Sequence, residues 1–257
     1  MTLAPDPSAV AERFSTAAAS YDAAAAVQRR AADLLTAHLP AEPAGRRIVD
    51  LGCGTGVLTA ALLGADPAAR ITGLDLAEGM IARCRATWPE HTFRVADAAT
   101  APPQPADLVA SSFALHWMAD GPAVLGRWLA ALPPGGLVAA AVPLPGSLDD
   151  LARAYAAETG RSWPGIAYPP AEAYREAMRT AGCRPRADTV TTLSQPCPDP
   201  ISALRTLRAL GATVRRPDAA RPAGAGALKR ALAAYADADG GAELAFRVLI
   251  LVAEKRA

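Results

Sequence analysis

The sequence predicts an α/β fold built on a doubly wound, mostly parallel seven-stranded sheet, and two features of the chain indicate it. Between residues 46 and 142, short apolar segments alternate regularly with helix-forming segments. This alternation is typical of parallel strands joined by helices that cover both faces of a sheet. Directly after the first apolar segment, glycines stand at alternate positions in Gly52-Cys53-Gly54-Thr55-Gly56. Such a turn lets a strand pass sharply into a helix while a ligand approaches the backbone.

The N-terminal half of the chain predicts helices followed by the regular part of the sheet. Ser20-Tyr21-Asp22 separates the first two predicted helices, because a Ser or Asp there can cap the second. The expected helices are 8–19, 22–38, 55–64, 78–87 and 121–132, and the expected strands are 46–51, 70–75, 91–96, 106–111 and 135–142.

After Pro145-Gly146 the pattern becomes less regular. Helices are expected at 147–157, 171–181, 199–210 and 227–236, and strands at 187–194 and 242–253. We expect a single domain over residues 1–257. Its parts are a helical lid at 1–40, a cofactor-binding core at 45–145, a helical cap with one core strand at 146–230, and a terminal strand at 242–254.

Charge and composition exclude several classes of partner. The net charge is only +1, whereas proteins that bind nucleic acid by phosphate neutralisation are strongly basic. The first 20 residues contain no continuous apolar segment, so neither a signal peptide nor a membrane span is expected. The four cysteines lack CxxC spacing and the three histidines stand far apart, which predicts neither a disulfide framework nor a metal site. We therefore expect a cytoplasmic protein without a nucleic-acid, membrane or metal partner.

Acidic residues follow the predicted strands at the edge where the glycine turn lies. Asp75 ends the strand 70–75, and Asp97 follows the strand 91–96. In a doubly wound sheet these ends line one crevice, where an acid can accept both hydroxyls of a ribose. Asp97 could accept an adenine amino hydrogen, since Ala96 and Ala98 leave room for the ring. The alternative for both carboxylates is a helix-capping or loop-capping role.

A dinucleotide is not favoured as the ligand of this crevice. Gly56 comes two residues after Gly54 and position 57 is Val, so the turn does not fit the pattern GxGxxG. The fourth predicted strand runs into the aromatic-rich segment 112–117 at the same edge of the sheet.

Over about residues 45–145 the sequence resembles the class I S-adenosylmethionine-dependent methyltransferases. Four features together carry this resemblance: the glycine turn, Asp75, Asp97 and segment 106–117. The resemblance implies a Rossmann-like fold with S-adenosylmethionine as cofactor. By that resemblance, Ser112 to Ala114 flank the sulfonium and Met80 packs on the purine. The resemblance implies the cofactor-binding residues Asp50, Gly52, Gly54, Asp75, Leu76, Met80, Asp97, Ala98 and Ser112.

Over nearly the whole chain the sequence is similar to the malonyl-acyl-carrier-protein O-methyltransferases of biotin synthesis. This resemblance implies an acyl substrate on an acidic acyl carrier protein. In place of the family's usual Gln, Asn and Phe, the chain has His116, Ser112 and Tyr168. The residues that carry it are Phe14, Ala17-Ala18, Tyr21-Asp22, Gln28, Leu115-His116-Trp117, Gly146-Ser147-Leu148, Pro169-Pro170 and the segment from Leu207 to Thr213.

Methylation of a malonyl carboxylate requires little acid–base chemistry, because a carboxyl with a pKa of about 4 is already ionised at neutral pH. We expect Tyr21, His116 and Trp117 to close the site around the sulfonium and the acceptor. His116 could instead act as a base for another acceptor or be a packed hydrogen-bonding residue.

A basic segment at 205–230 could dock the carrier protein or could be a solvated helical face. It holds Arg205, Arg208, Arg215, Arg216, Arg221, Lys229 and Arg230 against a single acid, Asp218. Three residues are candidates for substrate binding: Arg208, Tyr168 and His116. Of these, Arg208 could pair with the substrate carboxylate.

Three functional hypotheses follow from the sequence. The first is O-methylation of a malonyl thioester, or of another small natural-product acceptor. The second is cyclisation of S-adenosylmethionine to azetidine-2-carboxylate with release of methylthioadenosine, in which Tyr168 and Trp117 hold the sulfonium by cation–π contact. The third is a non-catalytic binding module.

Overall fold

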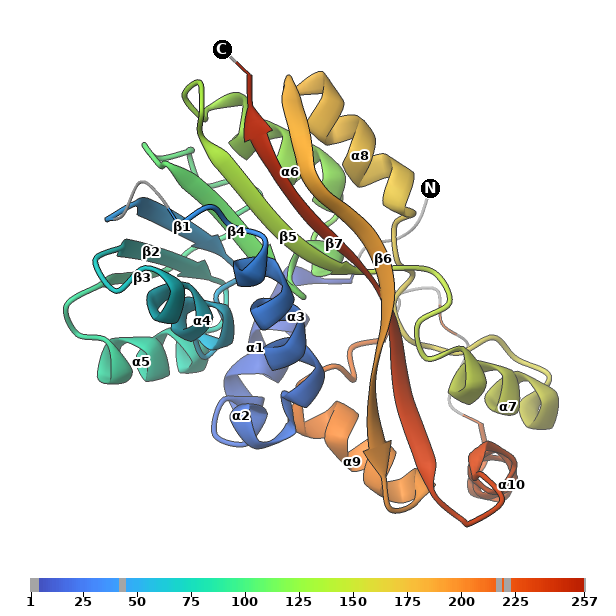
Figure 1. Cartoon of the computed structure of the whole chain (residues 1–257). Helices are drawn as coiled ribbons and strands as arrows, with labels where there is room; N and C mark the ends of the chain where they lie inside the picture. The colour runs from blue at the N-terminus through green and yellow to red at the C-terminus, as the bar shows by residue number, and fades with distance from the viewer. Residues whose placement is uncertain (1–4, 42–44, 216–218, 220–222, 257) are drawn as a thin grey trace.

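The computed structural model describes residues 5–41, 45–215, 219 and 223–256, and its helices are arranged around a seven-stranded sheet (Figure 1). The strand order is β3-β2-β1-β4-β5-β7-β6. The strands are β1 (Arg47–Leu51), β2 (Arg70–Asp75), β3 (Thr92–Val95), β4 (Leu108–Ser112), β5 (Leu137–Pro143), β6 (Cys183–Cys197) and β7 (Ala242–Lys255).

The sheet is mostly parallel. β1 to β5 pair in parallel, and β7 runs antiparallel to both of its neighbours, β5 and β6. Chain order reverses at β1, which lies between β2 and β4, so the carboxyl ends of β1, β2 and β4 meet at a switch point. The predicted doubly wound α/β sheet of seven strands is confirmed.

Helices cover both faces of the sheet, because successive strand residues point to opposite sides. Ile48 packs in a buried cluster with α3, α4 and α5, whereas Val49 packs in a second cluster with α6 and α8. The helices are α1 (Pro7–Ala17), α2 (Tyr21–Ala24), α3 (Ala26–Ala37), α4 (Val57–Ala65), α5 (Glu78–Thr87), α6 (Gly121–Ala130), α7 (Asp149–Thr159), α8 (Ala171–Thr180), α9 (Pro200–Ala209) and α10 (Ala225–Tyr235), with a 3-10 turn, η1, at Leu115–Trp117.

The prediction of one helix over 22–38 is wrong, because the chain leaves helical geometry at Ala25 (φ −85°, ψ 36°) between α2 and α3. Ala25 is fully buried, in contact with Ala24 and Leu210. The break turns α2 toward the glycine turn, where the Asp22 carboxylate accepts a hydrogen bond from Thr55 Oγ1 at 2.5 Å. Tertiary contacts therefore override the helical propensity of this alanine run.

The predicted strand 187–194 is too short, since β6 spans 15 residues. β6 is an edge strand and pairs with β7 from Cys183↔Lys255 to Cys197↔Ala242, whereas β5 pairs only with Val248 to Glu254. The outer part of this hairpin therefore extends beyond the sheet, with α9 packed against it and α7 beside α10 (Figure 1).

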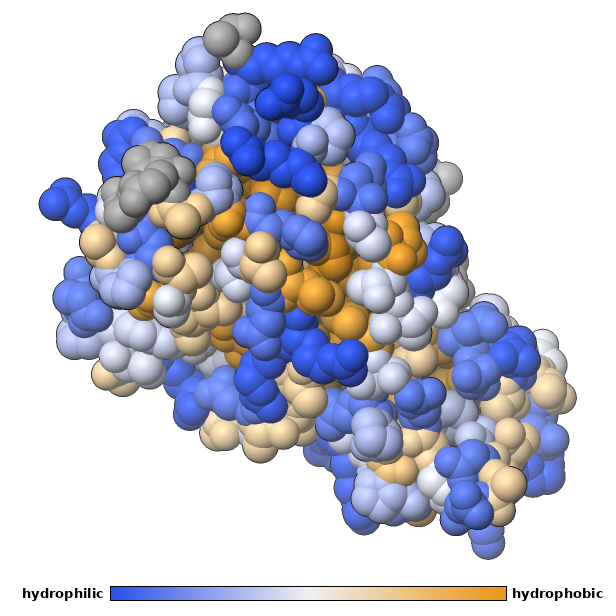
Figure 2. All heavy atoms as spheres, viewed as in Figure 1, coloured by the Kyte–Doolittle hydropathy of each residue, from blue (hydrophilic) through white to orange (hydrophobic). Residues whose placement is uncertain are grey.

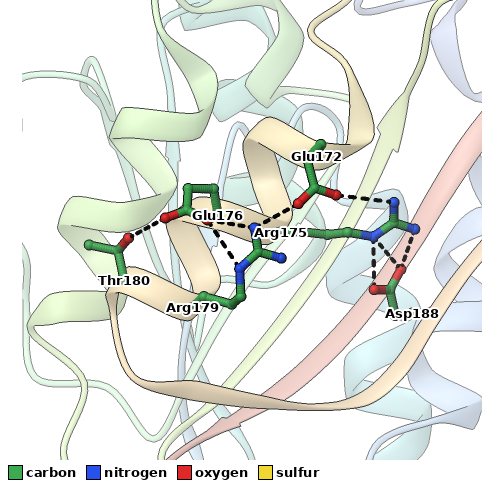
Figure 3. Close-up of polar contacts among 6 residues, drawn as sticks. All are labelled: Glu172, Arg175, Glu176, Arg179, Thr180 and Asp188. Atoms are coloured by element: carbon green, nitrogen blue, oxygen red, sulfur yellow. Dashed lines mark hydrogen bonds and ion pairs between the residues drawn. The ribbon is translucent and has the colours of Figure 1, made fainter.

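The ion pair between Arg175 and Asp188 ties α8 to the edge strand β6 (Figure 3). The Arg175 guanidinium donates to Asp188 of β6 at 2.7 Å, and both side chains are about three-quarters buried. Arg179 donates to Glu172 at 2.6 Å within the helix. The pair between Arg175 and Asp188 fixes α8, and with it the segment that enters α8, relative to β6.

Hydrophobic residues gather at the centre of the face seen in Figure 2, over the strands, and hydrophilic residues surround them. Within the described part of the chain, every helix is too short or too polar to cross a membrane.

Candidate active site

The glycine turn links β1 to α4 with three residues in the left-handed region. Their φ angles are +70° at Gly52, +55° at Gly54 and +92° at Gly56. A Cβ on Gly52 would lie 2.2 Å from the Ala114 Cβ, so only glycine fits there. A Cβ on Gly54 would meet nothing within 4 Å, because this glycine faces open space. The turn therefore exposes backbone to a ligand at Gly54. Helix α4 begins at Val57, two residues later than predicted, because Gly56 still has a left-handed φ.

Asp75 lies at the end of β2 and holds this turn in place. Its Oδ2 accepts the Gly54 N–H at 2.9 Å, and its Oδ1 accepts the Ala77 N–H at 2.8 Å. Burial raises the pKa of Asp75 above its usual value, and the two hydrogen bonds oppose that rise. Each carboxylate oxygen can accept a second hydrogen bond. The side chain is therefore able to bind two neighbouring hydroxyl groups without releasing the turn.

A cleft of about 1060 Å³, open solvent at its mouth included, lies between these strand ends and the N-terminal helices. Asp97, which follows β3, lines it and accepts the Ala99 N–H through Oδ1 at 2.8 Å. The cleft contains most residues predicted for the cofactor and two of those predicted for catalysis. They are Gly52, Gly54, Asp75, Leu76, Asp97, Ala98 and Ser112, with Tyr21 and Trp117.

Two residues expected to contact the cofactor, Asp50 and Met80, do not line the cleft. Neither side chain has exposed surface, so neither offers a ligand contact in this conformation. Asp50 accepts a hydrogen bond from Thr59 Oγ1 at 2.9 Å, and burial raises the pKa of Asp50 to about 7. Met80 packs against Ala18 and Phe14 and supports the N-terminal helices.

Arg208, which was expected at the substrate carboxylate, does not line the cleft. It is exposed on α9, whose buried face is formed by Ala203 and Leu207. Consecutive helical residues point about 100° apart, so burial of Leu207 turns Arg208 toward solvent.

His116 and Tyr168 line a second cavity, which shares Met118 and Ala119 with the cleft. Adjacent residues of η1 thus face different spaces, since Trp117 lines the cleft. Burial lowers the pKa of His116 to about 3, and it raises the pKa of Tyr168. At neutral pH both side chains are uncharged.

Aromatic rings connect the two spaces. Phe14 of α1 lies 6.4 Å from Tyr21 and 5.3 Å from Trp117 between ring centroids. His116 lies 5.1 Å from Trp117 and 5.5 Å from Tyr168. The row crosses from the N-terminal helices over the end of β4 to the segment before α8. Aromatic rings of this kind attract a cation placed over their faces.

Sequence reasoning gave no role to two residues of the cleft, Gln28 and Phe14, and it did not predict the strained backbone of Phe113, which it placed beside the sulfonium. The side chain of Gln28, in α3, is 7% exposed. Phe113 has a φ of +53°, and among the described residues it is one of two non-glycine residues with positive φ. Phe14 comes from α1. Gln28 and Phe14 belong to the family resemblance, which was the available signal for them, whereas nothing in the sequence marks the strained backbone of Phe113.

The atoms of the cleft fit S-adenosylmethionine. Gln28 Oε1 and Ser112 Oγ are buried without a protein hydrogen-bond partner. An unsatisfied buried polar atom costs about 1–3 kcal/mol, so both positions favour a polar ligand. The ammonium and hydroxyl groups of S-adenosylmethionine supply donors, and the open acceptor positions of Asp75 suit its ribose. Within the described residues, no group of His, Cys, Asp or Glu side chains is placed to hold a metal ion.

Comparison with known proteins gives matches along most of the chain. A model of the family described as "Methyltransferase domain" matches residues 23–187, more than half of the chain. The malonyl-[acyl-carrier protein] O-methyltransferase of Serratia marcescens is 34% identical over 208 residues, which are 80% of this chain and 78% of the relative. The trans-aconitate 2-methyltransferase of Variovorax paradoxus (strain S110) is 40% identical over 116 residues, 44% of each chain.

Among solved structures, magnesium protoporphyrin IX methyltransferase from Synechocystis PCC 6803, with S-adenosylmethionine bound, is similar in fold. Its TM-score is 0.53 at 14% identity, and the match covers 89% of this chain and 80% of that one.

Proposed function

The chain belongs to the methyltransferase domain family and is an S-adenosylmethionine-dependent methyltransferase, as its sequence predicted, and we propose that it methylates the free carboxylate of a malonyl thioester or a related small acid. Bound S-adenosylmethionine supplies an electrophilic methyl group: a bond forms from the acceptor oxygen to the methyl carbon, and the carbon–sulfur electron pair stays on sulfur.

The lack of a general base in the cleft carries this proposal. Among the described lining residues, the titratable side chains are Tyr21, Cys53, Asp75 and Asp97. Burial raises the pKa of Tyr21, and a hydrogen bond with Cys84 together with burial raises that of Cys53, so both stay protonated. The two carboxylates stand where ribose and adenine are proposed to bind. A hydroxyl or ammonium acceptor would need a base, whereas a carboxylate with a pKa of about 4 arrives ionised.

The remaining groups of the cleft position and desolvate the acceptor in this proposal. Tyr21 and Gln28 can donate hydrogen bonds to the carboxylate oxygen that is not methylated. Phe14 and Trp117 exclude water, which strips the carboxylate of its hydration and makes it more nucleophilic. Catalysis then rests on holding one oxygen in line with the methyl group.

The names of two relatives support a carboxylate acceptor, because malonyl and trans-aconitate both carry carboxylates. We extend the proposal to an acyl carrier protein that docks on α9 and α10, which are in contact. Arg205, Arg208 and Lys229 are exposed there, and Arg230 pairs with Glu158 at 2.9 Å. Three residues of the predicted basic segment lie outside the described residues: Arg216, Asp218 and Arg221.

Product analysis tests the proposal. The protein is incubated with S-adenosylmethionine alone and then with malonyl-N-acetylcysteamine, and nucleoside products are separated by chromatography. We expect S-adenosylhomocysteine and the methyl ester only when the thioester is present. Methylthioadenosine formed without an acceptor would replace the proposal with intramolecular cyclisation. Saturable cofactor binding without turnover of any acceptor would indicate a binding module.

A further inference from the structure

The turn that follows β3, residues 97–101, is called the adenine turn below, because the adenine of the cofactor is proposed to bind beside it. Its first three residues line the cleft. The N–H groups of Thr100 and Ala101 donate to the carbonyl of Asp97 at 3.1 and 2.7 Å. The N–H of Ala99 donates to the carboxylate of the same residue at 2.8 Å. The adenine turn is therefore folded around Asp97.

Two polar groups of the adenine turn are left for a ligand. Among the described residues, the Ala98 N–H has no acceptor and Asp97 Oδ2 has no donor. A donor next to an acceptor matches the hydrogen-bonding edge of adenine, where N1 accepts and the amino group donates. Hydrogen bonds weaken steeply when they are misaligned, so recognition of the base depends on the direction in which the turn holds these two groups.

Two neighbouring side chains of α6 hold the adenine turn from outside the cleft. The Arg127 guanidinium donates to the Ala98 carbonyl at 2.5 Å and to the Ala101 carbonyl at 2.6 Å. The indole N–H of Trp128 donates to the same Ala98 carbonyl at 3.0 Å. Neither Arg127 nor Trp128 lines the cleft. The two side chains therefore act on a ligand only through the turn.

One peptide group connects Arg127 to the Asp97 carboxylate. The Ala98 carbonyl and the Ala99 N–H belong to the same planar peptide group and point in opposite directions. Arg127 and Trp128 hold the carbonyl end, and the N–H end donates to Asp97 Oδ1. Rotation of this peptide group would break the contacts at both ends. Arg127 therefore fixes the direction of the carboxylate, and with it that of Oδ2.

The geometry of this contact requires a guanidinium. Among the described residues, the hydrogen bonds of Arg127 go only to main-chain carbonyls. Its guanidinium carbon lies 5.6 Å from the centre of the Trp128 ring, and Trp128 is 1% exposed. A guanidinium is a planar fork that can bridge two carbonyls, whereas a lysine ammonium is a compact point charge. A lysine at position 127 would keep the charge and lose the bridge.

We propose that Arg127 is a positioning residue for adenine: by holding the Ala98 and Ala101 carbonyls, it orients the open groups of the adenine turn and makes the protein select adenine over other purines. This inference rests on the proposed position of adenine at Asp97 and is independent of the proposed methyl acceptor. Because Arg127 does not line the cleft, its replacement should change recognition of the base while the ribose contacts at Asp75 remain.

A pair of ligands that differ only in the base tests the proposal. S-adenosylhomocysteine and S-inosylhomocysteine share the ribose and the amino acid, but hypoxanthine carries a proton at N1 and a carbonyl in place of the amino group. Both hydrogen bonds to the adenine turn then bring donor to donor and acceptor to acceptor. We expect calorimetric titration of the parent protein to show at least about a hundredfold weaker binding of the inosine ligand.

Arg127→Lys is the decisive variant. We expect its affinity for S-adenosylhomocysteine to fall about tenfold and the ratio of the two affinities to fall to about tenfold, because a loosened turn can rotate its groups away from a mismatched base. Arg85→Lys is the matched control, since Arg85 of α5 donates to the Phe93 carbonyl of β3 at 2.7 Å and lies outside the cleft. This control should keep the ratio of the parent.

A second variant makes the test independent of one substitution. Trp128→Phe removes the other donor to the Ala98 carbonyl and should lower the ratio about threefold. If both α6 variants lower Tm but keep the parent ratio, these side chains only stabilise the fold and the proposal is overturned. A parent ratio near one would overturn it too, because the turn would then not recognise the base. Failure to methylate any carboxylate would refute the proposed function alone, since the titrations contain no acceptor.

Discussion

Asp75 joins the fold to the proposed cofactor site, so its removal has two separable effects. In Asp75→Ala, the N–H groups of Gly54 and Ala77 lose an acceptor that lies 2.9 and 2.8 Å away. Each unsatisfied amide costs about 1 kcal/mol or more. We expect about 2 kcal/mol in total, since water can reach the mouth of the cleft. For a chain of this length that lowers Tm by about 4–8 °C.

The effect on cofactor affinity is larger. Two ribose hydroxyls bound to a carboxylate contribute about 1.5–3 kcal/mol each. Taking the lower value for each gives about 3 kcal/mol, which is about a hundredfold in Kd. Asp75→Asn keeps one acceptor oxygen but turns an NH2 donor toward the other backbone N–H, so it should retain at most half of the stability that Asp75→Ala loses, and it should still lose most of the affinity.

Calorimetric titration with S-adenosylhomocysteine measures the affinity, and thermal unfolding without ligand measures the stability. Asp107→Asn is the control, because Asp107 precedes β4 at the opposite edge of the sheet and pairs with Arg47 at 2.7 Å. This half-exposed pair contributes about 1 kcal/mol or less. Wild-type affinity in Asp75→Asn would refute the assignment of Asp75 to the ribose.

Three further predictions address the turn, the N-terminal helices and the second cavity. Gly52→Ala places a Cβ 2.2 Å from the Ala114 Cβ at a φ of +70°. The substitution should weaken S-adenosylhomocysteine binding at least about tenfold, as measured by calorimetry. Retained affinity would show that the turn adapts to the added methyl group. Asp22→Asn weakens the hydrogen bond with Thr55. The variant should raise KM for the cofactor about three- to tenfold and speed proteolysis within α1 and α2. Unchanged proteolysis would contradict a role of Asp22 in holding these helices. The unfolded chain protonates His116 near pH 6.5 and the folded one near pH 3, so this group alone makes acidification between these values cost about 1.4 kcal/mol per pH unit. Asp50, whose pKa is raised to about 7, acts in the opposite direction in both proteins, so Tm should fall less with acidification in His116→Phe than in the parent. Parallel pH curves for the two proteins would refute the low pKa.

The elements of the sheet could be predicted where local pattern and tertiary environment agree. β2 spans Arg70–Asp75 and α5 spans Glu78–Thr87, as expected. The central strands β1, β4 and β5 are buried on both faces, so each reads as a short apolar run. β6 was underestimated because Pro185 and Pro196 suggest breaks. An edge strand tolerates proline, and a register shift follows Pro185.

The cofactor side of the site was predictable for a similar reason. Strand ends in a doubly wound sheet converge, so Gly52, Asp75 and Asp97 could be placed together from their positions alone. The acceptor side depends on side-chain direction outside the regular sheet. Arg208 illustrates this, because the turn of α9 that buries Leu207 decides where Arg208 points, and that follows only from packing against the β6–β7 hairpin.

The distribution of charge explains why the proposed reaction does not require an arginine. S-adenosylmethionine carries a sulfonium and an ammonium against one carboxylate, a net positive charge, and the described charged residues that line the cleft, Asp75 and Asp97, are acids. The acceptor brings its own negative charge to the sulfonium. A guanidinium beside that carboxylate would repel the sulfonium and withdraw electron density from the attacking oxygen. Neutral donors such as Tyr21 and Gln28 orient the carboxylate without either cost. The position of Arg208 on the surface therefore agrees with a reaction in which the acceptor itself neutralises the methyl donor.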